Sequence, residues 1–161
     1  MEHLWSPWRM SYLQSPSAST SGCIFCDKPA EGRDAENLLV WRGASAYVIL
    51  NLYPYNNGHF MVVPYEHVDS PEHLAPAVLT ELFVLLNQGL AALRTMYQPQ
   101  AFNIGMNIGA AAGAGIAQHV HLHAVPRWAG DTNFMTVAAG TRVIPEDLRL
   151  TWERMRAAWP V

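Results

Sequence analysis

The stretch QHVHLHAVPRW (118–128) places three histidines at every second position: His119, His121 and His123. In an extended strand, alternate side chains point to the same face of the sheet. A strand here would therefore line up three imidazoles on one face and turn the apolar residues between them to the other. Three interpretations fit this pattern: imidazoles buried with hydrogen-bond partners, a metal centre, or catalysis by a nucleophilic or general-base histidine. The spacing does not separate the metal from the catalytic interpretation.

The composition is that of an ordinary single domain. The chain has 161 residues, of which half are apolar and 14% are charged, with a net charge of −3. This length can bury a core, and the absence of a basic excess argues against nucleic-acid binding. The most apolar helical stretch, 82–93, contains polar residues and is expected to be too short to span a membrane. Residues 1–10 lack a charged-then-apolar signal pattern, so we expect a cytoplasmic protein.

Strand-forming and helix-forming patterns follow one another along the chain. Leucines at three- and four-residue spacing predict one long helix that begins near Pro76 and ends before Pro99, and a short helix is expected at 145–159. Pro, Asn and Gly between the second and third strands predict a hairpin. The pattern predicts an α+β fold in one domain with a largely antiparallel sheet, an N-terminal arm and linker at 1–22 and a tail at 130–161. Strands are expected at 38–41, 45–51, 59–64, 101–107 and 119–125.

Cys23 and Cys26 form a C-x-x-C pair within GCIFC (22–26). In a reducing compartment such a pair indicates metal binding or redox chemistry, with two packed thiols as the plain alternative. A redox pair usually opens a helix directly after a strand, whereas this pair precedes the first expected strand. The sequence therefore favours a metal site with four ligands, whose other two would come from the seven histidines of the chain.

The segment GAAAGAGIAQ (109–118) consists almost entirely of small residues, and Gln118 is its first side chain with polar chemistry. Small residues let backbone N–H groups approach an anion closely. The segment lacks the Lys and Ser/Thr of a Walker loop, so a magnesium–nucleotide site of that type is not expected. A flexible loop is the alternative, but the position directly before the histidine row favours a functional role.

The histidine row resembles the signature of the histidine triad family, His-x-His-x-His-x-x, in which x is apolar. The resemblance extends over most of the chain. Within the family, the chain is similar to the bacterial branch related to diadenosine tetraphosphate phosphorylase. It implies a five-stranded antiparallel sheet with one long helix and a C-terminal helical tail, and a homodimer across which the sheet continues. The segments that carry it are LWSPWRMSYL (4–13), GCIFC (22–26), LNLYPYNNGHFMVVPYEHV (50–68), FNIGMN (102–107), AGAGIAQHVHLHAVPRW (112–128) and GDTNF (130–134).

The resemblance also implies a chemistry. In this family the middle histidine attacks the α-phosphate of a nucleotide, and an acceptor then cleaves the nucleotidyl-histidine. By this resemblance His121 is the nucleophile. It must be neutral at its attacking nitrogen, while its other ring nitrogen donates to a partner such as a backbone carbonyl. His123 would face the phosphate and stabilise its charge or protonate the leaving group.

The first histidine has a different role by the same resemblance. In zinc-containing members of the family it joins two cysteines and another histidine as a metal ligand. Two sulfur and two nitrogen ligands make a closed tetrahedral site, which is typical of structural and not of catalytic zinc. No organic cofactor is expected. The corresponding residues of this chain are Cys23, Cys26, His67 and His119.

Contacts to the substrate are carried over in the same way. Asn51 corresponds to a ribose contact, and Asn107 and the backbone around Gly115 correspond to phosphate contacts, with Gln118 as a further polar candidate. Ile116 departs from the pattern, because hydrolase and phosphoramidase relatives often have a Ser or Thr there that touches phosphate. This departure weakens the case for those two activities. The residues expected to line the base pocket are Ile49, His59 and Met61.

A phosphate acceptor would need a cation in the site. Lys28, the lone lysine of the chain, is interpreted as part of the linker after the cysteines. Arg127, or an Arg of the tail or partner subunit, is therefore the expected anchor, since Arg binds phosphate in a bidentate manner. Arg127 and Trp128 fit a surface cap equally well.

The expected function is phosphorolysis of diadenosine tetraphosphate to ATP and ADP through a nucleotidyl-histidine at His121. The partners would be a dinucleoside polyphosphate, phosphate and a second copy of the chain. Two alternatives from the same family are a hydrolase of these substrates and a purine nucleoside phosphoramidase. An alternative from another class is a zinc-stabilised nucleotide-binding or interaction protein with little catalysis.

Overall fold

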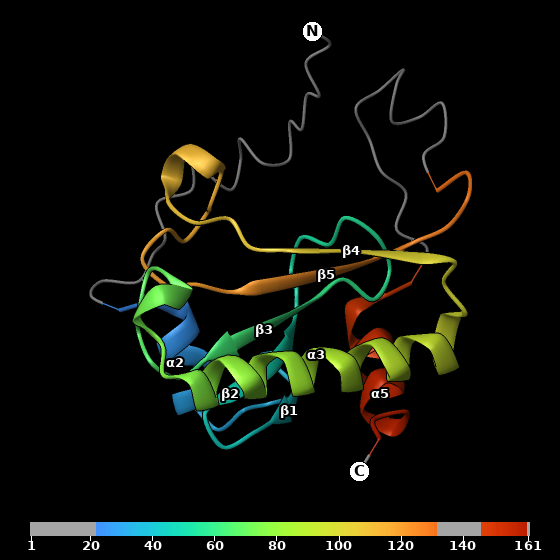
Figure 1. The fold of residues 1–161 in the computed structure, drawn as a ribbon. Helices are drawn as coiled ribbons and strands as arrows, with labels where there is room; N and C mark the ends of the chain where they lie inside the picture. Colours follow the sequence, from blue (N-terminus) through green and yellow to red (C-terminus); the bar gives the residue numbers. More distant parts are fainter. Residues whose placement is uncertain (1–21, 132–145, 161) are drawn as a thin grey trace, which may run out of the picture.

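An antiparallel sheet of five strands forms the centre of the structure, a computed structural model that describes residues 22–131 and 146–160 (Figure 1). The strands lie in the spatial order β1-β2-β3-β5-β4, and every neighbouring pair is antiparallel. The predicted α+β fold with a five-stranded antiparallel sheet is thus confirmed. Residues 1–21 of the expected arm and linker, and residues 132–145 and 161 of the expected tail, lie outside the described residues. The strands are β1 (Leu39–Arg42), β2 (Ala46–Leu50), β3 (Phe60–Pro64), β4 (Ala101–Gly105) and β5 (Leu122–Arg127).

The two central strands β2 and β3 are covered on both faces. They pair from Ala46 opposite Pro64 to Leu50 opposite Phe60, which confirms the predicted hairpin. Every residue of both strands is buried. Sheets with both faces covered have nearly continuous apolar strands, and the sequences AYVIL and FMVVP follow this rule.

The long helix α3 (Pro76–Tyr97) covers one face of the sheet (Figure 1). It begins at a proline, which suits the first turn of a helix, and it ends at Gln98 in the left-handed conformation with φ of 48°. Both ends agree with the sequence prediction. Gly89 lets the helix approach the sheet closely, because a Cβ at this position would lie 2.4 Å from Cζ of Phe60.

Helix α3 is also long and apolar enough, by length and composition alone, to cross a membrane. It has 22 residues, and an 18-residue window within it has a mean hydropathy of 1.5. The stretch 82–93, which was expected to be too short to span a membrane, is only part of this helix. Its buried residues pack against β2, β3 and β5, so α3 serves as a core helix in this structure.

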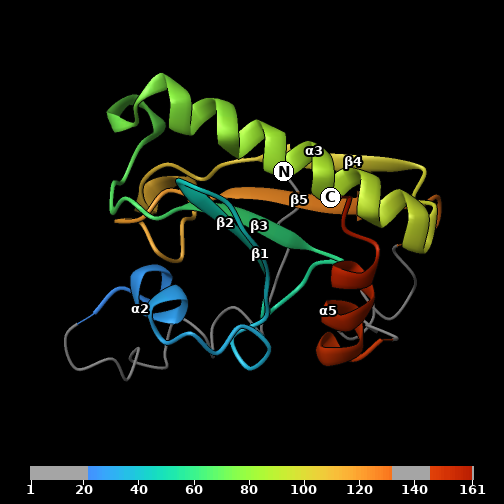
Figure 2. The ribbon, with the colours of Figure 1, turned by 90° about the horizontal axis from the view of Figure 1, so that it is seen from below.

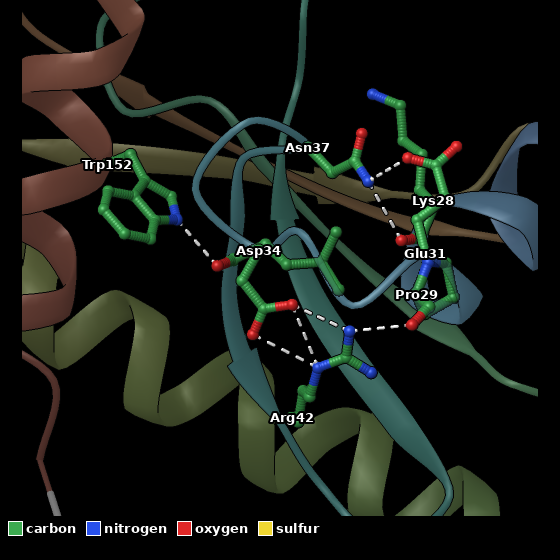
Figure 3. Close-up of polar contacts among 8 residues, drawn as sticks. Lys28, Pro29, Glu31, Asp34, Asn37, Arg42 and Trp152 are labelled. Atoms are coloured by element: carbon green, nitrogen blue, oxygen red, sulfur yellow. Dashed lines mark hydrogen bonds and ion pairs between the residues drawn. The ribbon is translucent and has the colours of Figure 1, made fainter.

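Two short helices complete the described part. Helix α2 (Ile24–Ala30) lies on the side of the sheet opposite to α3 (Figure 2) and was not predicted. Helix α5 (Leu148–Ala157) is shorter than the helix expected at 145–159 and packs against α3 and β1. The indole nitrogen of Trp152 in α5 donates to the carbonyl of Leu39 at 2.6 Å (Figure 3). Two 3₁₀ turns, Pro71–His73 and Ala110–Ala112, lie in the connections.

Strand β5 begins three residues later than predicted. Of the three alternating histidines, His123 alone lies within the strand, opposite Met61 of β3. The backbone before Leu122 forms other hydrogen bonds. The N–H of Val120 donates to the carbonyl of Val68 at 2.7 Å, and the carbonyl of His119 accepts a bond from the side chain of His121. One histidine of the row therefore lies in the strand, and the other two lie in the segment directly before it.

Candidate active site and metal centre

Helix α2 has seven residues, too few to be stable without tertiary contacts. Pro29 lacks an N–H, so the carbonyl of Phe25 loses its usual donor four residues later. The hydroxyl of Tyr47 in β2 donates to this carbonyl instead, at 2.6 Å. Arg42 donates to the carbonyl of Pro29 at 2.8 Å, and Asn37 donates to that of Lys28 at 3.1 Å (Figure 3). These bonds fix α2 against the sheet.

The four predicted metal ligands come together at the start of α2. The sulfur of Cys23 lies 3.3 Å from Nδ1 of His119, and the sulfur of Cys26 lies 3.4 Å from Nδ1 of His67. All four ligand atoms lie within 4.8 Å of one another. A tetrahedral zinc ion with ordinary bond lengths requires sulfur–nitrogen separations of roughly 3.6 Å. The four side chains therefore fit a tetrahedral ion with little movement.

Hydrogen bonding prepares His119 as a ligand. Its Nε2 lies 2.9 Å from the carbonyl oxygen of Pro64, which can only accept, so Nε2 carries the proton and Nδ1 keeps its lone pair for a cation. Such bonds fix the tautomer and orientation of metal-binding histidines. Burial and the neighbouring Cys23 raise the pKa of the Cys26 thiol to about 11. A cation is what would stabilise thiolates in this position.

His121 is held in one tautomer at the wall of a cavity. Its Nδ1 donates to the carbonyl of His119 at 2.8 Å, which confirms a backbone carbonyl as its partner. The proton is thus on Nδ1, and the lone pair is on Nε2. Burial lowers the pKa of this imidazole, and the ring packs 4.8 Å from that of Phe25 between centroids. A neutral imidazole in a fixed orientation is what nucleophilic attack requires.

His59 orients His123 from behind. The N–H of Tyr55 donates to Nδ1 of His59 at 3.1 Å, so the proton of His59 lies on Nε2. This proton points to Nδ1 of His123 at 3.0 Å, which places the proton of His123 on Nε2. The amide nitrogen of Asn51 lies 3.4 Å from Nε2 of His59, but both atoms are donors and the contact is no hydrogen bond. The pKa of His59 is lowered to about 3, mainly by burial and to a lesser extent by the charges of His123 and His121.

One cavity gathers most of the predicted site residues. It has about 910 Å³ of empty volume, a value that includes space open to solvent. Helix α2 contributes Ile24, Phe25 and Lys28, and the segment after β2 contributes Tyr53 and Tyr55. The predicted residues that line it are Ile49, Asn51, Met61, Asn107, Gly115, His121 and His123.

Two predicted substrate contacts do not line the cavity. His59 is 1% exposed, and its Nε2 lies 3.0 Å from Nδ1 of His123. Gln118 is exposed in the turn before the histidine row. The contribution of α2 was missed, since a seven-residue helix with an internal proline has no helical sequence pattern.

Arg127 is occupied elsewhere and is not among the residues lining the cavity. Its guanidinium binds both carboxylate oxygens of Asp131, at 2.6 and 2.8 Å, and the side-chain oxygen of Asn103 at 2.8 Å. Asp131 also accepts from Asn56 at 2.8 Å, and the bonds from Arg127 hold the pKa of this carboxyl well below its usual range. Arg127 therefore ties the end of β5 to neighbouring segments and does not serve as the phosphate anchor in this structure. An Arg of the tail or of a partner subunit as the anchor stays a prediction.

The sequence matches the HIT domain family over residues 33–130. It is 39% identical over 165 residues to a protein of Mycobacterium tuberculosis named AP-4-A phosphorylase, with 99% of this chain and 85% of the relative covered. It is also 32% identical over 91 residues to a protein of Schizosaccharomyces pombe named bis(5'-nucleosyl)-tetraphosphatase (asymmetrical). That match covers 56% of this chain and 50% of the relative.

A similar fold occurs among solved structures. A Zn-bound histidine triad family protein from Mycobacterium smegmatis gives a TM-score of 0.66 at 24% identity, with 85% of this chain and 92% of the other covered. At this identity the match supports the arrangement of strands and helices and nothing finer.

Proposed function

The chain belongs to the HIT domain family, and on this premise we propose that it is a nucleotidyltransferase that acts on dinucleoside polyphosphates through His121. The observation that carries the proposal is the geometry of this imidazole. Its Nδ1 donates to the carbonyl of His119, which leaves the lone pair of Nε2 for a ligand in the cavity. The relatives named above include enzymes of dinucleoside tetraphosphates, and this chain is an enzyme of the same family.

The proposed reaction has two displacements at one phosphorus atom. In the first, Nε2 of His121 forms a bond to the α-phosphorus, the bond to the bridging oxygen breaks, and its electron pair leaves with the polyphosphate. In the second, an oxygen of the acceptor attacks the same phosphorus, and the electron pair of the nitrogen–phosphorus bond returns to His121. The intermediate divides one difficult displacement into two easier ones.

The neighbouring residues would orient the substrate. His123, with its proton on Nε2, would donate a hydrogen bond to the phosphate or to the departing oxygen. Asn107 and the backbone around Gly115 would contact the phosphate, because both line the cavity together with His121. Asn51 would bind the ribose, with Ile49 and Met61 beside the base.

Phosphate is the proposed acceptor. The relative in M. tuberculosis, which is named as a phosphorylase, aligns with almost the whole chain. The relative named as a tetraphosphatase aligns with little more than half of it. Ile116 lines the cavity without a hydroxyl group, which agrees with the weaker case for a hydrolase.

Zinc is the proposed occupant of the Cys23–Cys26–His67–His119 site, which we call the Cys2His2 site. Its four side chains form a closed set of sulfur and nitrogen ligands, the kind that suits structural zinc. A bound ion would join α2 to the residues directly before β5. It would thereby stabilise one wall of the cavity and take no part in the displacements.

We also propose that two copies pair through β4. This strand lies at the end of the sheet, and among the described residues nothing pairs with its outer edge. Ile104 in β4 is 45% exposed. A second β4 on this edge would continue the sheet and cover unpaired backbone groups. A cytoplasmic location stays a prediction.

The experiment that tests the proposed function is product analysis. Diadenosine tetraphosphate is incubated with the protein at increasing phosphate concentrations, and nucleotides are separated and quantified. We expect ATP and ADP, with turnover that rises with phosphate. ATP and AMP at every phosphate concentration would identify a hydrolase, and tight nucleotide binding without products would identify a binding protein.

A further inference from the structure

Lys28 is placed by helix α2 at the wall of the cavity that holds His121 and His123. Residues three apart lie on the same side of a helix, so Lys28 shares a side with Phe25, whose ring lies 4.8 Å from that of His121. The three-residue offset between Phe25 and Lys28 corresponds to about 4.5 Å along the helix axis. Lys28 is half-buried at this wall.

Within the part of the chain that the structure describes, Lys28 is the one residue with a permanent positive charge that lines this cavity, and no carboxylate lines it. No ion pair engages its ammonium group among the same residues. The carboxylate of Glu31, three residues after Lys28, is bound by Arg33 at 2.6 Å and by Asn37 at 2.8 Å. In Figure 3 the side-chain nitrogen of Lys28 stands apart from these contacts.

The chemistry requires a cation on one particular side of the phosphorus atom. In an in-line displacement the nucleophile and the leaving group lie on opposite sides of the phosphorus. The polyphosphate therefore departs from the side opposite Nε2 of His121, and the acceptor must later attack from that same side. One anionic subsite thus serves both the departing polyphosphate and the entering phosphate.

We propose that Lys28 is the cation of this subsite and favours phosphate over water as the acceptor. This inference rests on the proposed function. A fixed cation lets phosphate compete with water, which is present at about 55 M, because a well-oriented bound reactant has an effective molarity far above that. The Cys2His2 site would also help to position this cation, since Cys26 lies on the same short helix as Lys28 and Cys23 directly precedes that helix.

The test compares Lys28→Met with Lys28→Arg and with Arg33→Met. Arg33 is a matched control: it loses the same charge five residues away, its side chain is 64% exposed, and it is not among the residues lining the cavity. Initial rates with diadenosine tetraphosphate are measured against phosphate concentration, and the ratio of ADP to AMP is recorded. Zinc content and the amount of adenylyl group on His121 in quenched samples are measured for each variant.

For Lys28→Met we expect kcat/KM for phosphate to fall roughly 10- to 100-fold, the range for loss of a hydrogen bond to a charged group, and the ADP to AMP ratio to fall with it. Lys28→Arg should retain most of the ratio, and Arg33→Met should match the wild type. If Lys28→Met keeps its adduct on His121 and its phosphate dependence, Lys28 has no role in the acceptor subsite, while the proposed function stands. If the wild type forms no adduct, the proposed function fails, and the inference fails with it.

A measurement on the unaltered protein covers the case in which Lys28→Met loses its fold. Lys28 is the only lysine of the chain, so acetylation of its side-chain amine can be followed by peptide mass spectrometry. Inorganic phosphate and ATP should each slow acetylation of Lys28. An unchanged rate at phosphate concentrations that saturate turnover would overturn the proposal.

Discussion

Replacing Tyr47 with Phe should destabilise the protein through a single lost hydrogen bond. The hydroxyl of Tyr47 donates to the carbonyl of Phe25 at 2.6 Å, and the side chain of Tyr47 is fully buried. Because Pro29 has no N–H, this carbonyl lacks the donor that a regular helix would supply. In Tyr47→Phe it would be left buried without this partner.

The magnitude follows from the burial of that carbonyl. A buried acceptor without a partner costs about 1–3 kcal/mol of unfolding free energy. For a domain of this size about 2 kcal/mol corresponds to a fall in Tm of roughly 4–8 °C. Urea-induced unfolding followed by circular dichroism would measure the change, and unchanged zinc content would show that α2 is still in place.

A double-mutant cycle with Pro29→Ala isolates the cause. Alanine restores an N–H that can donate to the carbonyl of Phe25, so Tyr47→Phe should cost at least about 1 kcal/mol less in this background. If Tyr47→Phe costs the same in the wild type and in the Pro29→Ala variant, the account of this hydrogen bond is wrong.

Three further predictions concern the metal, the core and the buried histidine. Cys23→Ser should reduce bound zinc well below one ion per chain and lower the Tm, whereas His121→Ala should keep its zinc. Loss of zinc in His121→Ala would indicate a metal centre formed by the histidine row. Gly89→Ala should destabilise by about 1–3 kcal/mol in urea unfolding, because its Cβ would lie 2.4 Å from Cζ of Phe60; an unchanged midpoint would show that the ring moves freely. The pKa of His59 falls from 6.5 to about 3, so His59 stays neutral in the folded protein while the unfolded chain takes up a proton below pH 6.5. The free energy of unfolding should therefore fall as the pH is lowered from 6.5 to 3. In His59→Gln the fall should be less steep, by at most about 1.4 kcal/mol per pH unit. Parallel curves of unfolding free energy against pH for the two proteins would contradict this.

The sequence predicted the sheet and the long helix because their signals are local. Apolar runs of β-formers mark β2 and β3, and prolines mark the limits of α3. The start of β5 was misplaced, because a bond between an imidazole and a carbonyl two residues away competes with strand pairing, and alternation alone does not reveal it.

The candidate site could be predicted where it consists of cysteine and histidine, because these residue types have few chemical roles in proteins. The four residues of the Cys2His2 site and the partner of His121 could be anticipated from the resemblance and from imidazole chemistry. Lys28 and Arg127 were misjudged for a common reason. The contacts that decide their roles are tertiary: Asp131 occupies Arg127, and bonds from the sheet hold α2 so that Lys28 lines the cavity.

The attachment of a nucleotide to His121 is the central claim, and intact-protein mass spectrometry tests it most directly. The protein is mixed with diadenosine tetraphosphate without phosphate, quenched under alkaline conditions that preserve a phosphoramidate, and digested to locate the adduct. We predict one adenylyl group on His121, absent in His121→Asn, and its disappearance with formation of ADP when phosphate is added before the quench. ATP and ADP formed at normal rates by His121→Asn, or an adduct on any other residue, would contradict the mechanism.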